Sequence, residues 1–413
     1  MIKEIKKSSV TGDITAPASK SFAQRAIAAA LLADGTTILE NVTLCDDTEA
    51  AIYTARRLGA KIENQGRKYT VRGGISPEAY ELNIGESGLS TRLFTPIASL
   101  YNKPLTITGH GSILNRPVTM VEEPLRQLGV EVETNAGYLP LTVCGPLRGG
   151  EIEVDGSMSS QFITGLLMAL PLAEKDSILN IAVLNSKPYV DMTLQVAESF
   201  GINILNEDYR KFIIRGRQKY KPLIYNVEGD WSGASCILVA GAIAGEVTVG
   251  NLNPQSTQAD KEIITALIRS GASVSIENNE VTVRRAELKS YDFDATDCPD
   301  LFPALAVLAA KCKGISTIKG TTRLTNKESD RAETIASMLR AMGIKIDISE
   351  IDLMKIEGGC IQSAEVDSFN DHRIAMAAAV AGVASDGSVL IKRAEAVNKS
   401  YPRFWEDMAA LMD

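Results

Sequence analysis

Histidine is scarce in this sequence, and aromatic residues are few. His110 and His372 are the two histidines of the 413-residue chain, which leaves little from which to build a histidine metal site or a Ser-His-Asp triad. The six cysteines lie far apart, include no C-x-x-C pair and stand mostly in apolar surroundings, so we expect buried free thiols. The sequence predicts no metal site.

Long apolar runs are also missing. The longest ones are interrupted by glycine or lysine within about 12 residues, whereas a helix that crosses a bilayer needs roughly 18 to 20. Residues 1–7 alternate lysine with isoleucine, which is unlike the apolar centre of a signal peptide. We therefore expect a cytoplasmic protein without membrane contact.

An excess of basic residues is absent as well. The net charge of −8 argues against a nucleic-acid partner, which would require a basic face. Any anionic ligand would have to be held by a local cluster of basic side chains. The balance of apolar and charged residues is that of a globular protein and excludes disordered and collagen-like chains, and the length fits two or three domains.

What the sequence does contain is an internal repeat. Six segments combine a short strand, a turn and a helix of small apolar residues, namely residues 14–35, 82–102, 152–174, 225–246, 291–314 and 367–387. Between them, amphipathic helices end about every 70 residues at a glycine that is followed by a strand, at Gly59, Gly129, Gly201, Gly271 and Gly343. Each of these glycines suits the left-handed position after a helix end. The repeat is therefore a β-α-β-α-β-β unit.

The sixth copy is cut short, because the chain ends in its second helix. Residues 1–14 have the alternation of the missing strand, so we expect them to complete the last copy and to bring both termini into one domain. Two domains of three copies follow. Residues 19–228 form an inserted middle domain, and residues 1–18 together with 229–413 form a terminal domain, with crossings near residues 16–20 and 228–230.

The helix of the sixth copy begins with charged residues and continues with apolar ones. After Asp371, His372 and Arg373 it has no polar face, which predicts burial on nearly every side. A helix N-terminus carries unsatisfied N–H groups and a partial positive charge, and it therefore suits an anion. We expect such helix starts from both domains to line a cleft that binds anions. Whether His372 contacts phosphate, orients Asp371 or caps the helix stays open.

Basic side chains recur at or near several of these helix starts, among them Lys20, Arg25, Arg92 and Arg373. Taken singly, a serine or aspartate before a helix is an ordinary cap, and a charged helix start is an ordinary solvated surface. A helix N-terminus nevertheless disfavours cations unless an anion lies between them. The recurrence therefore favours a shared anionic ligand.

At these residues the sequence resembles the enolpyruvyl transferases, in particular those that act on shikimate 3-phosphate. The segments PASKSFAQRA, LNRPVTMVEEPLRQLG, DGSMSSQFITGLLMALPL, SKPYVDMT, VEGDWSGAS, NKESDRAE, NDHRIAMA and NKSYPRFWEDM all occur in the order typical of the family. The resemblance implies an α/β fold, a two-domain inside-out α/β barrel of six βαβαββ repeats, three per domain, whose cleft closes on substrate. It implies that the enolpyruvyl group of phosphoenolpyruvate moves to the 5-hydroxyl of shikimate 3-phosphate through a tetrahedral intermediate, with release of phosphate.

The resemblance also implies roles for individual residues. Asp300 would be the base toward the hydroxyl, with Glu328 and Lys20 as proton carriers at C3 of phosphoenolpyruvate. Shikimate 3-phosphate would contact Lys20, Ser21, Arg25, Ser159, Ser160, Gln161, Ser186, Tyr189, Asp300 and Lys327. Phosphoenolpyruvate would contact Lys20, Gly88, Arg116, Gln161, Arg331, Arg373 and Lys399. No cofactor is implied, the partners are these two small anions, and we expect a monomer.

One loop departs from the family pattern. The usual G-N-A-G-T-A-x-R is GESGLSTR here, with Glu86 in place of asparagine and Leu89 in place of threonine, whereas Gly88 is retained. An acid beside the expected phosphoenolpyruvate site calls into question the affinity for that substrate and the response to glyphosate, which competes for the same pocket.

Two alternatives remain. The sister enzyme that acts on UDP-N-acetylglucosamine usually has a cysteine before the R-P of the middle domain, an asparagine after the first lysine and D-L-R in place of D-H-R. This chain has no such cysteine, has Ser21 after Lys20, and keeps His372. The other alternative is a non-catalytic relative that binds anions, and the presence of both Asp300 and Glu328 argues against it.

Overall fold

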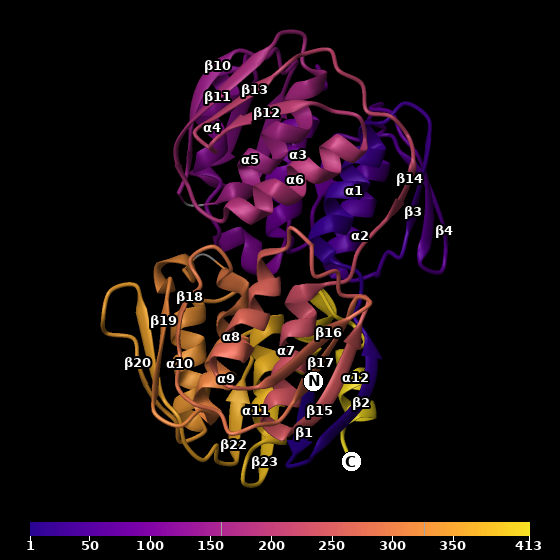
Figure 1. Ribbon diagram of the computed structural model, residues 1–413. Coiled ribbons are helices and arrows are strands. Elements are labelled where there is room, and N and C mark those ends of the chain that lie inside the picture. Colours follow the sequence, from indigo (N-terminus) through magenta and orange to yellow (C-terminus); the bar gives the residue numbers. More distant parts are fainter. Residues whose placement is uncertain (158, 326) are drawn as a thin grey trace. The chain divides into compact units, whose positions relative to one another are not determined.

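The computed structural model describes residues 1–157, 159–325 and 327–413, which form two compact units (Figure 1). The terminal unit comprises Met1–Pro17 and Glu228–Asp413, and the middle unit comprises Ala18–Val227. The boundaries expected from the sequence lie one residue further along the chain at both crossings. Both chain ends, marked N and C in Figure 1, belong to the terminal unit.

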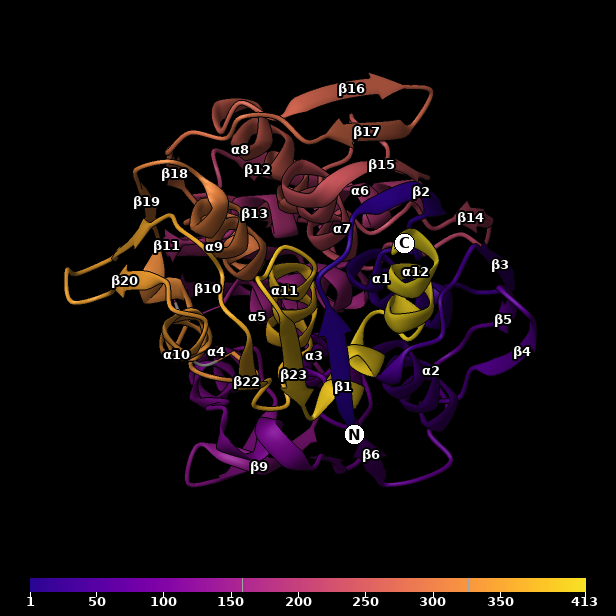
Figure 2. The ribbon, with the colours of Figure 1, turned by 90° about the horizontal axis from the view of Figure 1, so that it is seen from below.

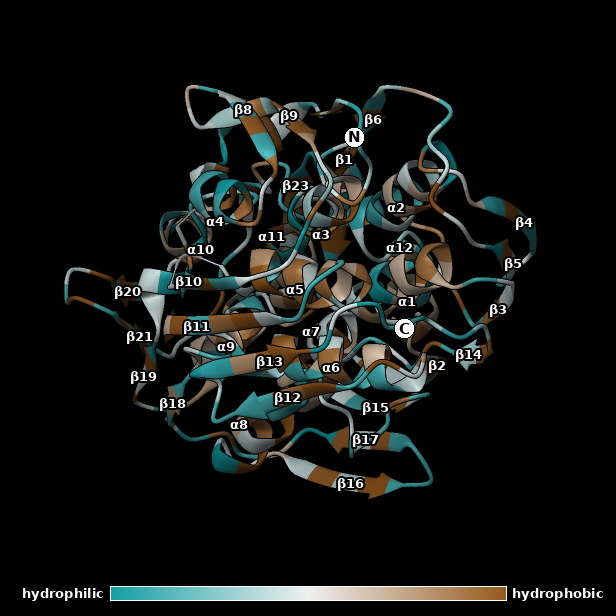
Figure 3. Ribbon diagram, turned by 90° about the horizontal axis from the view of Figure 1, so that it is seen from above, coloured by the Kyte–Doolittle hydropathy of each residue, from teal (hydrophilic) through white to brown (hydrophobic). Residues whose placement is uncertain are grey.

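In the middle unit, three sheets surround the buried helices α1, α3 and α5 (Figure 3). The strand orders are β14-β3-β5-β4, β6-β7-β9-β8 and β10-β11-β13-β12. The strands are β3 (Thr36–Glu40), β4 (Lys61–Gln65), β5 (Lys68–Arg72), β6 (Glu81–Asn83), β7 (Leu105–Thr108), β8 (Glu131–Asn135), β9 (Tyr138–Cys144), β10 (Glu151–Gly156), β11 (Ser177–Leu184), β12 (Ile204–Glu207), β13 (Lys211–Ile214) and β14 (Ile224–Asn226). The helices are α1 (Lys20–Leu32), α2 (Asp46–Arg57), α3 (Gly88–Ala98), α4 (Glu122–Gln127), α5 (Ser160–Ala169) and α6 (Lys187–Ser199).

The terminal unit repeats this plan around α7 (Trp231–Ala244), α9 (Phe302–Lys311) and α11 (His372–Val383), which contact one another (Figure 2). Its strand orders are β16-β17-β15-β2, β18-β19-β21-β20 and β1-β23-β22. The strands are β1 (Ile2–Lys6), β2 (Val10–Thr15), β15 (Gly245–Gly250), β16 (Ser273–Glu277), β17 (Glu280–Arg284), β18 (Asp292–Asp294), β19 (Ile315–Lys319), β20 (Lys345–Asp347), β21 (Leu353–Glu357), β22 (Ala364–Asp367) and β23 (Ser388–Lys392). The outer helices are α8 (Ile263–Arg269), α10 (Arg331–Ala341) and α12 (Phe404–Leu411).

Short 3-10 helices complete both units. They are η1 (Gly111–Asn115), η2 (Thr119–Val121), η3 (Leu170–Leu172), η4 (Ala259–Glu262), η5 (Pro299–Leu301), η6 (Thr321–Arg323) and η7 (Ala394–Lys399). Of these, η5 leads directly into α9 and η7 packs against α11, so both lie beside the buried helices of the terminal unit. Within the described part of the chain, no helix has the length and apolarity needed to span a membrane.

The six helices that begin the repeats form the core, as their small apolar residues predict. Every residue of α7 and of α11 is buried, which confirms the burial expected for the helix after Asp371. Small residues let the helices approach closely. A Cβ at Gly165 of α5 would lie 2.9 Å from Cγ of Pro96 in α3, closer than real Cβ contacts, so the packing of these two helices requires glycine there.

The glycines that follow the second helices have the expected conformation. Gly59, Gly129, Gly201, Gly271 and Gly343 follow the last residues of α2, α4, α6, α8 and α10, and their φ angles lie between +76° and +117°. Glycine adopts a positive φ without the steric cost that a side chain would add. This part of the repeat prediction is confirmed.

Strand pairing completes the sixth copy but exchanges two strands. β1 pairs antiparallel with β23, so the N-terminal strand joins the last sheet as expected. β2 pairs with β15 in the terminal unit, and β14 pairs with β3 in the middle unit. Each of these strands therefore lies in a different unit from the helix that follows it, because the chain passes from one unit to the other in the turn between strand and helix. The crossings expected near residues 16–20 and 228–230 likewise fall between strand and helix.

The cysteines follow the expectation in part. Cys45, Cys236, Cys298 and Cys312 are buried free thiols. Cys360 is exposed, and Cys144 is half-buried. Burial raises the pKa of Cys45 to about 11, so this thiol stays protonated at neutral pH.

Candidate functional site

In the terminal unit, three basic side chains converge on Asp300 of η5. Its Oδ1 accepts hydrogen bonds from Lys327 Nζ (3.3 Å) and Arg331 Nη1 (2.6 Å), and its Oδ2 accepts one from Arg373 Nη2 (2.9 Å). Burial alone would raise the pKa of Asp300, but the charges of Arg373, Lys327 and Arg331 outweigh burial and hold that pKa well below its usual value. Asp300 is therefore an ionised carboxylate in this arrangement.

Arg331, the first residue of α10, is the centre of this cluster. Its guanidinium is almost fully buried and also binds Glu328 through Nη2 and Asp371 through Nε (2.8 Å to Oδ2). Burial lowers the pKa of a guanidinium, but Asp371, Glu328 and Asp300 together raise the pKa of Arg331 well above its usual value. One cation thus holds three carboxylates from η5, the start of α10 and the start of α11.

Arg373 connects the starts of two buried helices. Its Nη1 donates to the hydroxyl of Ser232 in the first turn of α7, while its own backbone N–H donates to Asp371, the N-cap of α11 (3.0 Å). His372 is completely buried, with Nδ1 3.7 Å from Asp371 Oδ1, which is too long for a hydrogen bond. Lys399, at the end of η7, is also buried, and η7 packs against α11.

In the middle unit, Lys20 forms an ion pair with an acid that sequence reasoning did not single out. Lys20 is the first residue of α1, and its Nζ lies 2.9 Å from Oδ2 of Asp47 in the first turn of α2. Both side chains are largely buried. The ion pair holds the ammonium group of Lys20 at the start of α1.

Arg25 lies inside the middle unit, one turn after Ser21. Its guanidinium donates to Ser21 O (2.8 Å), Tyr189 O (2.9 Å) and Thr193 Oγ1 (2.9 Å). A longer bond reaches Thr164 Oγ1 at 3.4 Å. Burial lowers the pKa of Arg25 to about 10, because these acceptors carry no full charge to offset desolvation. Arg25 therefore ties α1 to α5 and α6.

Serines stand at the starts of α5 and α6. Ser159 caps α5 by accepting the backbone N–H of Gln161 (3.2 Å), and Ser160, the first residue of the helix, is buried. Ser186 precedes α6 with φ +58°, a left-handed conformation that few residues other than glycine and asparagine adopt. Tyr189 lies in the first turn of α6 and is half-buried.

The start of α3 carries Gly88, which Arg116 covers. A Cβ on Gly88 would lie 2.8 Å from Cζ of Arg116, so the guanidinium lies directly against the glycine backbone. Arg92 of α3 donates to Gly88 O (3.1 Å), Pro117 O (3.0 Å) and Gln161 Oε1 (3.3 Å). The structure thus brings Gly88, Arg116 and Gln161 together around Arg92.

Sequence reasoning also missed Asp260 of η4. Asp260 is buried beside Ser232, whose hydroxyl hydrogen-bonds its carboxylate, and within the described residues its Oδ1 has no hydrogen-bond partner. Burial, reinforced by the charge of Asp300 and opposed by Arg373, raises the pKa of Asp260 to about 6. No periodic pattern marks Asp260 in the sequence, because it lies in a short 3-10 helix.

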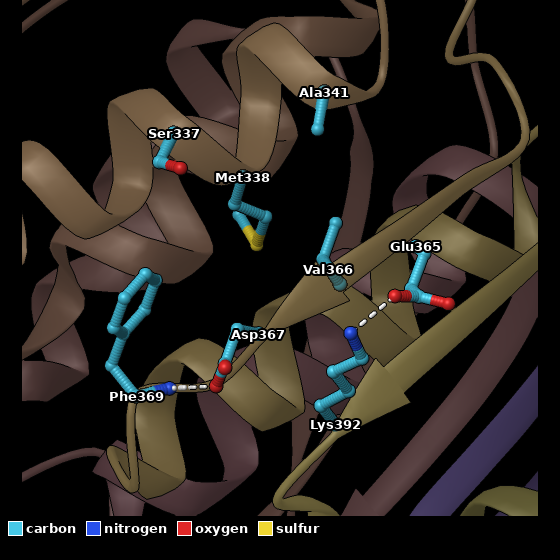
Figure 4. A pocket seen from close by; sticks show the side chains of 8 residues that line it. All are labelled: Ser337, Met338, Ala341, Glu365, Val366, Asp367, Phe369 and Lys392. Atoms are coloured by element: carbon cyan, nitrogen blue, oxygen red, sulfur yellow. Dashed lines mark hydrogen bonds and ion pairs between the residues drawn. The ribbon is translucent and has the colours of Figure 1, made fainter.

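A surface pocket in the terminal unit lies between α10 and β22 (Figure 4). It is lined by Ser337, Met338, Ala341, Glu365, Val366, Asp367, Phe369 and Lys392. Lys392 pairs with Glu365, and the backbone N–H of Phe369 donates to Asp367 (2.8 Å). None of the expected site residues lines this pocket. Among the residues that the structure describes, no group of three or more histidine, cysteine or acidic side chains is placed to hold a metal.

Comparison with known proteins identifies the family. The model of EPSP synthase (3-phosphoshikimate 1-carboxyvinyltransferase) matches residues 5–408. This chain belongs to the EPSP synthase family. A 3-phosphoshikimate 1-carboxyvinyltransferase from Clostridium novyi is 37% identical over 417 residues, covering 97% of this chain and 95% of the relative.

Solved structures agree with that membership of the EPSP synthase family. An EPSP synthase from Acinetobacter baumannii has a TM-score of 0.85 and 27% identity, covering 99% of this chain and 98% of that one. The enolpyruvyl transferase NikO from Streptomyces tendae has a TM-score of 0.80 at 18% identity, covering 100% of this chain and 97% of that one, and it supports the fold alone. The expected α/β fold of two domains is confirmed.

Proposed function

We propose that this chain transfers the enolpyruvyl group of phosphoenolpyruvate to the 5-hydroxyl of shikimate 3-phosphate, giving 5-enolpyruvylshikimate 3-phosphate and phosphate. Family membership supports this activity, as do relatives named 3-phosphoshikimate 1-carboxyvinyltransferase. The structural observation that carries it is the convergence of Lys327, Arg331 and Arg373 on Asp300 at the starts of α9, α10 and α11. Such a cluster suits phosphate and carboxylate groups. The reaction belongs to aromatic amino-acid biosynthesis, and we place it in the cytoplasm, in a monomer.

The two substrates would use the residues implied by the family resemblance. Shikimate 3-phosphate would bind to Lys20, Ser21, Arg25, Ser159, Ser160, Gln161, Ser186, Tyr189, Asp300 and Lys327. Phosphoenolpyruvate would bind to Lys20, Gly88, Arg116, Gln161, Arg331, Arg373 and Lys399. Planar guanidinium groups suit both the carboxylate and the phosphate of this substrate.

Asp300 would act as the base toward the 5-hydroxyl. In the ligand-free arrangement its pKa lies well below the usual value, which makes it a weak base. Substrate anions that draw Arg331 and Arg373 toward themselves would weaken their pull on Asp300, and its basicity would rise. Substrate binding would in this way prepare the base.

The proton reaching C3 of phosphoenolpyruvate would come from Glu328 and Lys20. Glu328 binds Arg331, so its carboxyl group is already held beside the basic cluster. Lys327, Arg331 and Arg373 would then stabilise the negative charge that develops on the departing phosphate. Every step of this mechanism uses side chains of the chain itself.

The test is phosphate release from shikimate 3-phosphate with phosphoenolpyruvate, and in parallel from UDP-N-acetylglucosamine with phosphoenolpyruvate. Asp300→Asn should reduce release with shikimate 3-phosphate by at least a hundredfold. The matched control Asp294→Asn changes an exposed, lysine-paired aspartate nearby and should keep full activity. Release only with the UDP-sugar would identify the sister reaction. Binding of shikimate 3-phosphate without release in either assay would identify a non-catalytic relative.

A further inference from the structure

Glu86, the acid that replaces the usual asparagine, directs its carboxylate toward η1. Its Oε2 accepts both the backbone N–H of Ser112 (3.0 Å) and the hydroxyl of Ser112 (2.7 Å). Glu86 precedes α3 by two residues, and Ser112 is the second residue of η1. The carboxylate therefore joins the α3 start to the loop that leads to Arg116.

The approach of Glu86 depends on a glycine in the opposing loop. Gly111 has φ +64°, and a Cβ there would lie 2.7 Å from Oε2 of Glu86. A side chain at position 111 would thus be strained by its backbone and would collide with the carboxylate. Gly111 and Glu86 fit each other as a pair.

A second glycine, Gly88 at the start of α3, is likewise covered by a charged side chain, here one from the segment after η1. Arg116, directly after η1, extends back over Gly88 at the start of α3, where a Cβ would lie 2.8 Å from Cζ of Arg116. On the far side of Arg116, the carbonyl of Pro117 accepts a hydrogen bond from Arg92 (3.0 Å). The segment 111–117 is thus held against α3 by Glu86 before Arg116 and by Arg92 after it.

The charge of Glu86 is directed at this segment. Two hydrogen bonds from Ser112, one from its backbone N–H and one from its hydroxyl, fix the position of the carboxylate. Repulsion of phosphoenolpyruvate by Glu86 would not require these two hydrogen bonds to Ser112. The geometry accounts for an acid next to Gly88 without loss of the anion site.

We propose that Glu86 is a positioning residue for phosphoenolpyruvate: by binding Ser112 it holds segment 111–116 against α3 and sets the guanidinium of Arg116 over Gly88. The proposal rests on the proposed function, in which Arg116 binds that substrate. Loss of the Glu86 carboxylate would release the loop and let Arg116 sample other positions. The affinity for phosphoenolpyruvate would fall, while shikimate 3-phosphate would bind as before.

Kinetics of four variants test the proposal. Glu86→Ala and Ser112→Ala should each raise KM for phosphoenolpyruvate by about tenfold, with kcat and KM for shikimate 3-phosphate within about twofold of the unmodified enzyme. Glu86→Gln keeps an acceptor oxygen and should restore most of the affinity. The control Glu81→Gln changes an exposed acid of β6 that accepts a hydrogen bond from Thr108 (2.9 Å) of the neighbouring strand β7, and it should change neither KM nor kcat.

The opposite result would identify a different role. If Glu86→Ala and Glu86→Gln both lower KM for phosphoenolpyruvate, Glu86 acts as a repelling charge and the proposal fails. An unchanged KM in Glu86→Ala would also overturn it. A uniform loss of kcat and of affinity for both substrates would indicate damage to the fold, which the unfolding midpoint of the same variant would show.

A second measurement does not depend on activity. Amide hydrogen exchange of residues 111–116 should be faster in Glu86→Ala than in the unmodified chain and in Glu81→Gln, because the loop has lost its anchor. Equal exchange would contradict the proposal. If the unmodified chain releases no phosphate, the proposed function falls, and the exchange result still decides whether Glu86 holds the loop.

Discussion

Arg331 and Asp371 form a buried ion pair that joins the start of α10 to the cap of α11, with Nε 2.8 Å from Oδ2. Asp371 also accepts the hydroxyl of Ser329 (3.0 Å) and the backbone N–H of Arg373 (3.0 Å). This explains how an apolar, fully buried helix can begin with charged residues. The charge of Asp371 is compensated by Arg331, and the charge of Arg373 is compensated by Asp300, so both side chains can be buried away from solvent.

Removal of the Asp371 charge should therefore destabilise the terminal unit. Asp371→Asn keeps a helix cap but leaves Arg331 with one carboxylate fewer, and loss of one partner of a buried pair costs about 3 kcal/mol. Both tryptophans, Trp231 and Trp405, lie in this unit, so urea unfolding followed by tryptophan fluorescence measures its free energy of unfolding.

The exposed pair between Asp367 and Arg393 supplies the control for that measurement. Asp367→Asn should cost less than about 1 kcal/mol, since solvent screens a surface ion pair. If the two variants lost the same free energy of unfolding, burial of Asp371 would not strengthen its ion pair relative to the exposed one.

Two glycines of the middle unit should respond differently to alanine. At Gly88 the added Cβ meets the end of the flexible Arg116 side chain, which can move away. Gly88→Ala should therefore change stability by less than about 1 kcal/mol while raising KM for phosphoenolpyruvate severalfold. At Gly165 the Cβ meets the backbone carbonyl of Arg92 and the ring of Pro96, which cannot move alone. Gly165→Ala should cost roughly 1–3 kcal/mol of stability.

Urea unfolding followed by circular dichroism, together with KM for phosphoenolpyruvate, separates the two glycine variants. A Gly88→Ala enzyme with unaltered KM would show that the position of Arg116 over Gly88 does not matter for binding. A Gly165→Ala protein of normal stability would show that α3 and α5 can move apart at little cost.

Lys20 and Asp47 allow the catalytic role proposed for Lys20 to be separated from its structural role in the ion pair. Lys20→Met should abolish turnover, and it should also destabilise the middle unit by about 1–3 kcal/mol, because Asp47 is left in a largely buried site without its ion pair. Adding Asp47→Asn should restore stability but not turnover.

A double-mutant cycle of Lys20→Met and Asp47→Asn checks this, with stability from circular dichroism and turnover from phosphate release. Recovery of turnover in the double variant would mean that Lys20 acts only through Asp47, and it would exclude the ammonium group as a proton carrier.

Local signals in the sequence predicted much of the fold. Gly59 and the four later helix-end glycines were found because a left-handed residue after a helix favours glycine whatever lies around it. The pairing of β1 with β23 followed from the alternation of the first residues and the missing strand of the last repeat. The sheet partners of β2 and β14 were not predicted, because the expected domain boundaries show on which side of a crossing a strand lies but not which strand it pairs with.

In the candidate site, too, some features were predicted from the sequence and others were not. The family resemblance grouped Arg331 with Arg373, and the structure places both on Asp300. The partners Asp47 and Asp260 were not predicted, because nothing in a sequence shows which acids a fold will bury. The role of Arg25 in substrate binding stays a prediction, since in the structure it binds neutral acceptors of its own unit.

Asp260 makes the stability of the terminal unit depend on pH in a specific direction. Burial and the neighbouring Asp300 raise its pKa from 3.8 to about 6, against the attraction of Arg373. Between these two values the folded protein binds more protons than the unfolded one, so stability falls as pH rises from about 4 to 6. The two pKa values correspond to a loss of up to about 3 kcal/mol above pH 7.

Asp260→Asn removes this titration while keeping a polar side chain beside Ser232. The groups that face Asp260 are Asp300, Arg373, Asp230 and Cys298, and all of them remain in the variant. The variant should therefore gain stability relative to the unmodified chain as pH rises from about 4 to 6, and the difference should change little above pH 7.

Urea unfolding at intervals between pH 4.5 and 8, followed by tryptophan fluorescence, measures the Asp260→Asn difference directly. Glu262→Gln is the control, since Glu262 is an exposed carboxylate of the same 3-10 helix, and its replacement should change stability by less than about 0.5 kcal/mol at each pH. A difference between Asp260→Asn and the unmodified chain that stays constant from pH 5 to 7 would show that Asp260 is ionised throughout. Its contacts with Ser232 and Arg373 would then be strong enough to offset burial beside Asp300.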